Sequence, residues 1–276
     1  MSVSSEITRR AKSNLAFALS ILPRERREDM VVFYAFCRTM DDIADDPAME
    51  ASARSAALRG WREGLEHGFP APGEFEREVV DMRDRNHVPN DLLLAIIDGC
   101  EMDLKPQRFG TWEDLERYTW KVACAVGLVS VRLFGCQDPV SDRYAVALGH
   151  ALQLTNILRD IGEDLSNGLR IYLPLADLSR FQYTERDLVG RVHDGRFLAL
   201  MEYEAGRAEM YFKEAEECLP AMDRESLLPA RIMAEIYHTL LVKMRADGFR
   251  VFAKRYAISK ARKLTILSKH LIARKR

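Results

Sequence analysis

The sequence is poor in cysteine, and its five cysteines form no CxxC pair. They are scattered along the chain, at Cys37, Cys100, Cys124, Cys136 and Cys218. An odd number of widely separated thiols argues against a disulfide framework and against a structural zinc site. The cysteines therefore favour a reducing, cytoplasmic environment.

Long apolar runs are also missing. No stretch approaches the roughly 20 apolar residues of a membrane-spanning helix. The amino-terminal segment MSVSSEITRRAKSN is too polar for the apolar core of a signal peptide. We therefore expect a cytoplasmic protein whose membrane contact is at most peripheral.

Several sequence signatures of common enzyme and binding folds are absent. No GxGxxG follows a strand, and neither a P-loop nor a GxSxG motif occurs. The formal net charge is −1, with 41 basic and 42 acidic residues, so there is no overall electrostatic basis for nucleic-acid binding.

Helical periodicity dominates the 276 residues, and prolines fall between the periodic segments. We find no alternating strand pattern, no repeat and no linker, so the pattern predicts one all-α domain over 1–276. The predicted helices are 6–21, 24–46, 50–67, 74–86, 90–104, 111–135, 140–166, 184–192, 195–218, 222–247 and 259–273. Residues 67–73 and 166–183 are predicted to be loops.

An acid cluster ends the second predicted helix, in YAFCRTMDDIADD. Its members are Asp41, Asp42, Asp45 and Asp46. Like charges spaced i,i+4 destabilise a helix by about 0.2–0.5 kcal/mol per pair, so a bound cation is a reason to keep them. Tyr34 and Arg38 share the same helix face. The alternative is a solvated, acid-rich helix end before Pro47.

A second acid cluster lies in QLTNILRDIGEDL, where one polar stripe runs along an otherwise apolar helix. The stripe consists of Gln153, Asn156, Asp160 and Asp164. Buried unpaired carboxylates are costly, so this stripe should face a wet cavity, a ligand or a partner. Arg159 can pair with Glu163 beside it. The alternative is a solvent-facing stripe on a surface helix.

The two acidic stripes, facing each other across a bundle, would hold several Mg²⁺ ions with a diphosphate between them. Metal ions and arginines can stabilise a diphosphate leaving group, and aromatic faces can stabilise the carbocation it leaves behind. For most candidate aromatics ordinary core packing is the stronger interpretation, Tyr34 and Tyr118 excepted. The candidates are Phe17, Phe33, Tyr34, Phe36, Tyr118 and Trp120.

Two further segments have open interpretations. Small residues at Ala123, Ala125 and Gly127 indicate either a close approach of the backbone, a helix kink or tight packing. The carboxyl-terminal 25 residues are basic, which fits a solvated helix face or a binding surface. The basic residues are Lys254, Arg255, Lys260, Arg262, Lys263, Lys269, Arg274, Lys275 and Arg276.

The motifs YAFCRTMDDIADD and LQLTNILRDIGEDLSNGLRIYLP resemble the two signature motifs of the squalene/phytoene synthase family. YTWKVACAVG and GFRVFAKRYAISKARKL resemble two more blocks of that family, and together the four extend from about residue 13 to 265. The resemblance implies a single isoprenoid-synthase-type helical bundle with a central apolar cavity.

The same resemblance implies roles for individual residues. Mg²⁺ would be bound by Asp41, Asp45, Asp160 and Asp164. Catalytic roles would fall to Tyr34, Arg38, Tyr118 and Arg159. Substrate contacts would come from Gln153, Asn156, Tyr237, Arg255 and Lys263, with a further basic contact near Lys12 or Ser13. The extra acids Asp42 and Asp46, and Trp120 in place of a family tyrosine or histidine, depart from the pattern.

The implied reaction is Mg²⁺-dependent head-to-head (1′-1) condensation of two prenyl diphosphates. The closest resemblance is to bacterial presqualene diphosphate synthases, which indicates two farnesyl diphosphates as substrates. NADPH would be needed only if the product continues to squalene. A phytoene synthase using two geranylgeranyl diphosphates is the alternative within the family.

Other functions are less compatible with the sequence. The NILRDIGED spacing and the YAFCR lead-in argue against a head-to-tail prenyltransferase or a terpene cyclase. A non-enzymatic alternative is a helical scaffold that binds acidic or membrane surfaces through its basic tail. Peripheral membrane contact for product release fits both views, while substrate chain length and oligomeric state stay open.

Overall fold

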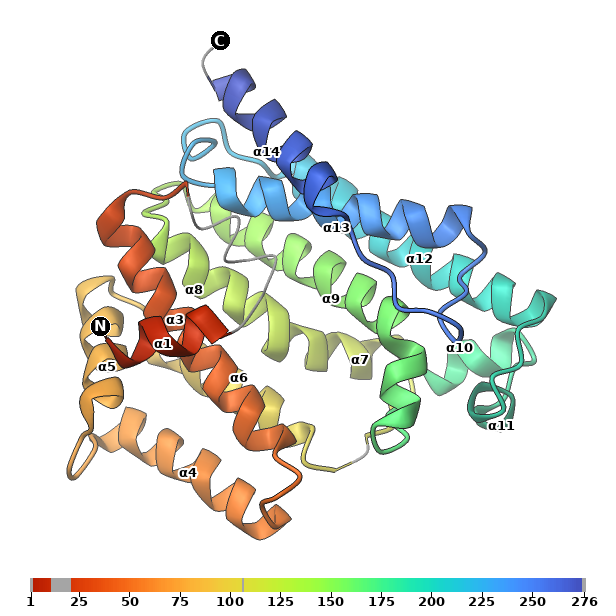
Figure 1. Cartoon of the computed structure of the whole chain (residues 1–276), viewed down its shortest axis with the longest axis horizontal. Helices are drawn as coiled ribbons and strands as arrows, with labels where there is room; N and C mark the ends of the chain where they lie inside the picture. The colour runs from red at the N-terminus through yellow and green to blue at the C-terminus, as the bar shows by residue number, and fades with distance from the viewer. Residues whose placement is uncertain (1, 11–20, 106, 275–276) are drawn as a thin grey trace.

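The computed structural model describes residues 2–10, 21–105 and 107–274, and within these ranges it contains helices and no β-strand (Figure 1). The predicted all-α class is therefore confirmed. The elements are α1 (Val3–Arg10), α3 (Arg24–Asp45), α4 (Ala51–His67), α5 (Glu74–Arg85), α6 (Asn90–Met102), α7 (Trp112–Thr119), η1 (Trp120–Cys124), α8 (Ala125–Leu133), α9 (Val140–Ser166), α10 (Leu175–Arg180), α11 (Glu185–Val189), α12 (Gly195–Glu217), α13 (Leu228–Ala246) and α14 (Lys260–Arg274).

The two helices with acidic stripes begin and end close to where the sequence predicts. Pro23 precedes α3 and Pro139 precedes α9, each with a φ near −55° that suits a helix start. The helix predicted at 6–21 is described only as α1, because residues 11–20 lie outside the described ranges. All five cysteines are free thiols, as the sequence indicates.

Two predicted boundaries are wrong. The loop expected at 166–183 contains α10, whose six residues are too few for a periodic signal. The helix expected from residue 222 begins only at Leu228. The intervening turn is held by Asp223, whose buried carboxylate accepts hydrogen bonds from the Gln137 and Asp138 N–H groups and the Ser141 hydroxyl.

Helix α9 is the centre of the bundle and packs against α7, η1, α8, α12 and α13 (Figure 1). Gly149 lets η1 approach α9 closely, since a Cβ there would lie 2.8 Å from the Cα of Cys124. Most of the buried apolar side chains form one cluster that extends from Leu22 to Tyr256. The central position of α9 keeps its polar stripe inside the molecule.

The segment predicted as one helix over 111–135 is interrupted by a π-helical turn at η1. This turn contains Ala123 and is followed by Ala125 and Gly127, the small residues for which we predicted a close approach of the backbone, a kink or tight packing. A Cβ on Gly127 would lie 2.9 Å from the Ala145 carbonyl oxygen. The kink and the close packing therefore both occur: the wide π-helical turn and the tight contact with α9 lie in the same stretch of chain.

The aromatic candidates separate into two groups. Phe33 and Phe36 are fully buried in the apolar cluster, which confirms ordinary core packing for both. Tyr34 is half-buried and Trp120 is 36% exposed. Phe17 lies outside the described ranges. Among the described helices, none combines the length and apolar composition that a bilayer-spanning segment requires.

Candidate active site

The acid cluster of α3 contributes two carboxylates to the site and uses two others locally. Asp42 forms an ion pair with Arg38 at 2.5 Å, one helical turn away. Asp46 accepts a hydrogen bond from the Ala48 N–H at 2.8 Å, beyond the helix end. Asp42 and Asp46, the two extra acids of the motif, therefore have local structural roles. Asp41 and Asp45 remain to face other elements.

The polar stripe of α9 is half-buried along its whole length, so it is not a solvent-facing surface. Asp160 accepts hydrogen bonds from Arg159 at 2.8 and 2.5 Å and from Arg255 at 2.9 Å. Burial would raise the pKa of Asp160, but these two guanidinium groups outweigh it and lower the pKa. The expected Arg159–Glu163 pair is absent from the described contacts, and Arg255 contacts Glu163 instead.

Two polar groups on the same stripe lack partners. The Oδ1 atom of Asn156 is buried and has no hydrogen-bond partner, while its amide nitrogen donates to Gln153 at 3.4 Å. The carboxylate of Asp164 forms no hydrogen bond or ion pair with the described residues. Desolvation and the nearby negative charge of Asp160 raise the pKa of Asp164 to about 7. Both groups are free to coordinate a cation.

Asp103, which follows α6, connects the two stripes and was missed in the sequence. Its carboxylate accepts hydrogen bonds from the Tyr118 hydroxyl at 2.8 Å and the Tyr172 hydroxyl at 3.1 Å. Desolvation raises the pKa of Asp103, and the two tyrosines oppose that rise. Its charge also acts on Asp41 of α3 and Asp164 of α9. The two acidic stripes therefore converge around Asp103.

Arg170 makes a second connection between the stripes. Its guanidinium forms an ion pair with Asp45 at 2.6 Å. Its positive charge also partly offsets the rise in pKa that burial causes at Asp103 and Asp164. The loop after α9 places it there, because the Arg170 N–H donates to the Asp164 carbonyl oxygen at 3.0 Å. A fixed cation therefore already lies among the acids of both helices.

The carboxylate of Asp41 lies beside a thiol. Cys100 of α6 is 3.5 Å from the Asp41 Oδ1 atom and can donate its S–H. Desolvation by the surrounding protein raises the pKa of Asp41 to about 6, although the carboxylate keeps contact with solvent. At neutral pH the Asp41 carboxylate is negatively charged, and its surroundings compensate that charge only weakly.

The segment after α13 brings Arg255 to Asp160. Gly162, two residues after Asp160 and on the buried side of α9, makes room for it: a Cβ there would lie 2.5 Å from the Val251 carbonyl oxygen. Tyr237 of α13 lies beside Arg159 and interacts with its guanidinium. The sequence predictions for Arg255 and Tyr237 therefore fall on residues that reach this site.

Two other predicted residues are placed less directly. Lys263 lies in the first turn of α14, half-buried, and forms no ion pair with the described acidic residues. The basic contact expected near Lys12 or Ser13 lies outside the described ranges. Tyr34 lies on the same face of α3 as Arg38 and Asp41, one and two turns before them.

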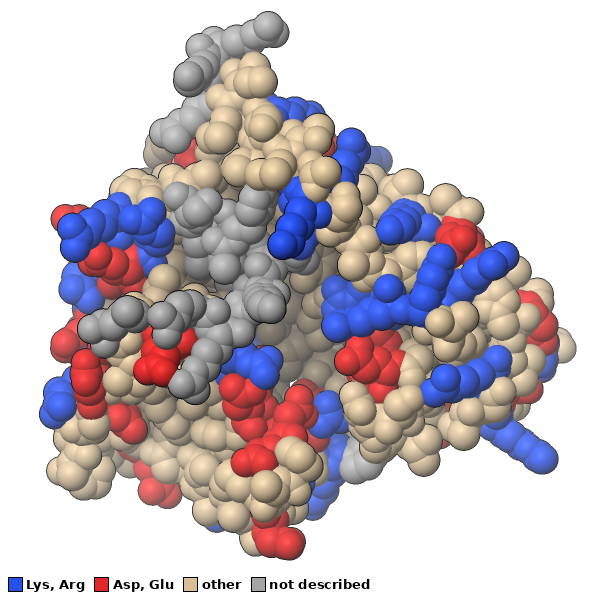
Figure 2. All heavy atoms as spheres, viewed as in Figure 1, with Lys and Arg blue, Asp and Glu red and all other residues tan. Residues whose placement is uncertain are grey.

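The space-filling view in Figure 2 shows a hollow near the middle of one face, with acidic and basic side chains gathered around it. In the described part of the chain, no three His, Cys, Asp or Glu side chains meet closely enough to hold one ion between them. The carboxylates instead come from several helices and are connected through Arg170 and Tyr172, which contact Asp45 and Asp103. Such an arrangement can bind a larger ligand that brings cations with it.

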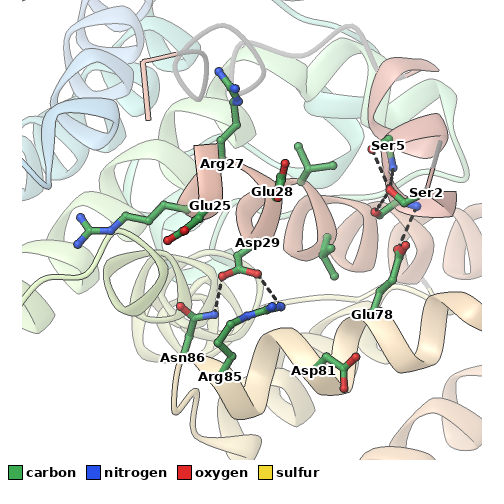
Figure 3. A pocket seen from close by; sticks show the side chains of 14 residues that line it. Ser2, Ser5, Glu25, Arg27, Glu28, Asp29, Glu78, Asp81, Arg85 and Asn86 are labelled. Atoms are coloured by element: carbon green, nitrogen blue, oxygen red, sulfur yellow. Dashed lines mark hydrogen bonds and ion pairs between the residues drawn. The ribbon is translucent and has the colours of Figure 1, made fainter. Parts of the chain in front are cut away.

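A separate polar pocket of about 1030 Å³ lies between α1, α3 and α5 (Figure 3). Its charged lining is largely satisfied within the protein. Asp29 accepts a hydrogen bond from Asn86 at 2.8 Å and pairs with Arg85 at 3.0 Å, and Glu78 accepts from the Ser4 N–H at 3.3 Å. These contacts attach α1 to the bundle, and the charged lining residues that have no partner among the described residues, Glu25, Arg27 and Asp81, are exposed to solvent, unlike the half-buried Asp164 of α9.

Comparison with known proteins identifies the family. The family model for squalene/phytoene synthase matches residues 8–262. The chain is 35% identical to a 15-cis-phytoene synthase from Synechocystis sp. over 261 residues, which covers 90% of this chain and 77% of that protein. It is 37% identical to a presqualene diphosphate synthase from Zymomonas mobilis over 243 residues, covering 86% and 82% of the two chains.

A solved structure supports the same assignment. The crystal structure of a dehydrosqualene synthase with a ligand superposes with a TM-score of 0.86 at 28% identity, covering 99% of this chain and 95% of that one. The similarity therefore extends over the whole helical bundle and includes both acidic stripes.

Proposed function

Because the chain belongs to the squalene/phytoene synthase family, whose members are prenyltransferases that join two prenyl diphosphates head to head, we propose that it condenses two farnesyl diphosphates to presqualene diphosphate. The observation that carries this proposal is the convergence of the acidic stripes of α3 and α9, where Arg170, held by its N–H on the Asp164 carbonyl oxygen, pairs with Asp45 at 2.6 Å. We also propose that 1–276 acts as one catalytic domain, since one apolar cluster extends from Leu22 to Tyr256.

The residues present fit Mg²⁺ ions that accompany the diphosphates. The orphan Oδ1 of Asn156 and the unpaired Asp164 are oxygen donors, the kind of ligand that Mg²⁺ prefers. The residues that would hold it are Asp41 and Asp45 on α3 and Asp160 and Asp164 on α9. Bound Mg²⁺ would stabilise negative charge on the departing diphosphate oxygens.

The basic residues of the site would bind and orient the diphosphates. Arg159 and Arg255 already lie together at Asp160, and Arg38 lies one turn before Asp41. In the proposed reaction the bond from C1 of the first substrate to its diphosphate oxygen breaks, and the electron pair leaves with the diphosphate. The C2–C3 double bond of the second substrate attacks C1, and loss of one proton closes the cyclopropane ring.

The polar stripe and its neighbours would position the substrates. Gln153 and Asn156 are hydrogen-bonded to each other on the inner side of α9, and Tyr237 supports Arg159. We propose substrate contact for these three and a diphosphate contact for Lys263. Tyr34, half-buried on the face of α3 that carries Asp41, would lie against the reacting prenyl chains.

The released diphosphate is the better candidate for the base that removes the proton. Tyr118 is buried and donates its hydroxyl hydrogen to Asp103. Desolvation, reinforced by the charge of Asp103, raises the pKa of Tyr118 well above its usual value. A tyrosine in this state keeps its proton and cannot accept another, so its proposed role is to hold Asp103 and to line the cation site.

Phytoene synthesis from two geranylgeranyl diphosphates is the second candidate, favoured by the Synechocystis relative at 35% identity. Incubating the purified protein with C15 or C20 diphosphate and Mg²⁺, with and without NADPH, separates the two. Presqualene diphosphate from the C15 substrate is the expected product, and squalene with NADPH would extend the assignment. Phytoene from the C20 substrate alone would overturn our choice, and no diphosphate release from either would favour a scaffold.

Alanine variants test the acidic site itself. Asp41→Ala and Asp160→Ala should abolish turnover while circular dichroism shows unchanged helicity. Asp46→Ala is the matched control, because this acid of the same motif only accepts from the Ala48 N–H. Near-normal turnover in either of the first two variants would contradict the proposed site.

A further inference from the structure

The carboxyl-terminal part of the chain has a strong excess of positive charge. No Asp or Glu follows Asp247, whereas the whole chain has a net charge of −1. The basic residues of this part are Arg250, Lys254, Arg255, Lys260, Arg262, Lys263, Lys269, Arg274, Lys275 and Arg276. A basic segment of this kind attracts a negatively charged surface.

Helix α14 carries apolar side chains on two opposite faces. Ile266, 1% exposed, packs on Ile232 and Ile236 of α13 and attaches the helix to the bundle. On the outer face Leu264 and Ile272 are 54% and 62% exposed, about two turns apart along the helix and about 80° apart around its axis. This outer apolar pair is therefore not needed to hold α14 in place.

A groove lies between α13 and the start of α14. It has a volume of about 330 Å³ and is partly apolar, with Val242, which is 48% exposed, and the partly buried Ile258 in its lining. Two basic residues, Lys243 and Arg262, border the same groove. Lys260, in the first turn of α14, is exposed beside it.

We propose that the outer face of α14 and this groove form a docking surface for an anionic lipid bilayer. Exposed aliphatic side chains flanked by Lys and Arg, with no acid on the helix, are the features that bind such an interface. Met210 on α12 is similarly exposed, at 56%, but its neighbours along the helix include Glu209, Glu214 and Glu217. Exposure alone therefore does not distinguish α14; exposure combined with positive charge does.

The position of this surface suits a lipid substrate. The segment that leads into α14 also carries Arg255, which pairs with Asp160 in the candidate active site. Docking would hold that segment, and with it one side of the active site, near the bilayer where prenyl chains partition. This use of the surface rests on the proposed function, whereas docking itself requires no turnover.

Vesicle co-sedimentation tests the apolar pair Leu264 and Ile272. Vesicles of phosphatidylcholine mixed with phosphatidylglycerol should bind the full chain, and Leu264→Ser and Ile272→Ser should each lower the partition coefficient about tenfold. Met210→Ser is the matched control and should leave binding unchanged. Binding that Leu264→Ser and Ile272→Ser do not weaken would overturn the proposal, as would an equal loss with Met210→Ser.

The same assay tests the charge. Lys260→Gln and Arg262→Gln should each lower binding about fivefold, whereas Lys213→Gln on α12 should not. Binding should weaken with added salt and vanish on pure phosphatidylcholine vesicles. Equal binding to neutral vesicles, or binding to a DNA duplex but to no vesicle, would overturn the proposal. Thermal melting and prenyl diphosphate turnover, measured in parallel, separate a folding defect or a failed catalytic assignment from lost docking.

Discussion

Replacing Arg170 by glutamine should increase the affinity of the substrate-free protein for Mg²⁺. Arg170 pairs with Asp45 at 2.6 Å and its charge acts on Asp103 and Asp164. A cation that binds Asp45 must compete with this guanidinium. The arginine therefore opposes metal binding until a diphosphate arrives to bring further negative charge.

The size of the effect follows from the exposure of the pair. The side chains of Arg170 and Asp45 are 25% and 58% exposed, so the ion pair is screened and contributes about 0.2–1 kcal/mol. Removing it should tighten metal binding by up to about fivefold. Arg170→Lys keeps the charge but loses the planar geometry of the guanidinium, so it should lie between wild type and Arg170→Gln.

Titration of Mn²⁺ followed by electron paramagnetic resonance measures the free ion directly and needs no turnover. Arg191→Gln is the control, because this arginine at the same end of α9 donates to the Ser166 hydroxyl at 2.8 Å and not to a carboxylate. The Asp45→Asn background should remove the effect of Arg170→Gln. Unchanged or weaker Mn²⁺ binding in Arg170→Gln would refute the reasoning.

Two other predictions concern the carboxylates of α9 and the packing around them. The pKa values of Asp164 and Asp41 are raised to about 7 and 6, so both carboxylates lose their charge as the pH falls from 8 to 5. Mg²⁺ affinity, measured by isothermal titration calorimetry, should therefore decrease over that range. Asp164→Asn should remove the part of the decrease that occurs near pH 7. In the metal-free protein Asp164 should destabilise the fold increasingly as the pH rises from 4 to 7, because the folded state holds its proton more tightly than the unfolded state. Asp164→Asn should therefore melt at a higher temperature than wild type at pH 7 and should lose this advantage at pH 4; an advantage that does not depend on pH would contradict the assignment of Asp164. Gly162→Ala should destabilise the fold by about 1–3 kcal/mol in urea denaturation and impair turnover, because the added Cβ would meet the Val251 carbonyl oxygen. The control is Gly206→Ala, whose Cβ would lie in open space on α12. It should stabilise the fold by up to about 1 kcal/mol.

The helices that carry the site were predictable because their signals are local. The prolines before α3 and α9 mark helix starts, and acids repeated every three or four residues mark one face of each helix. The same local reasoning failed at α10, which is shorter than two turns, and at Asp223, whose hydrogen-bond partners lie about 85 residues earlier in the chain.

The connections between the two stripes could not be predicted in the same way. Asp103 is a single acid after an apolar helix, with no repeat to mark it, and it meets Tyr172 only through the fold. Arg170 lies within a motif that the sequence does reveal, but its pairing with Asp45 spans 125 residues. Contacts of this kind depend on how helices pack, and periodicity within one helix carries no information about them.

The π-helical turn at η1 limits how the chain can change in length. A π-helical turn takes one more residue than an α-helical turn, so η1 holds one residue beyond what a continuous α-helix from α7 to α8 would need. Deleting one residue between Trp120 and Cys124 would let the turn close as α-helix, with the side chains of α7 still facing the same way. A second deletion would turn every side chain of α7 by about 100° and point Tyr118 away from Asp103. Homologous chains that keep this tyrosine–aspartate pair should therefore tolerate the loss of one residue at the turn, but not of two.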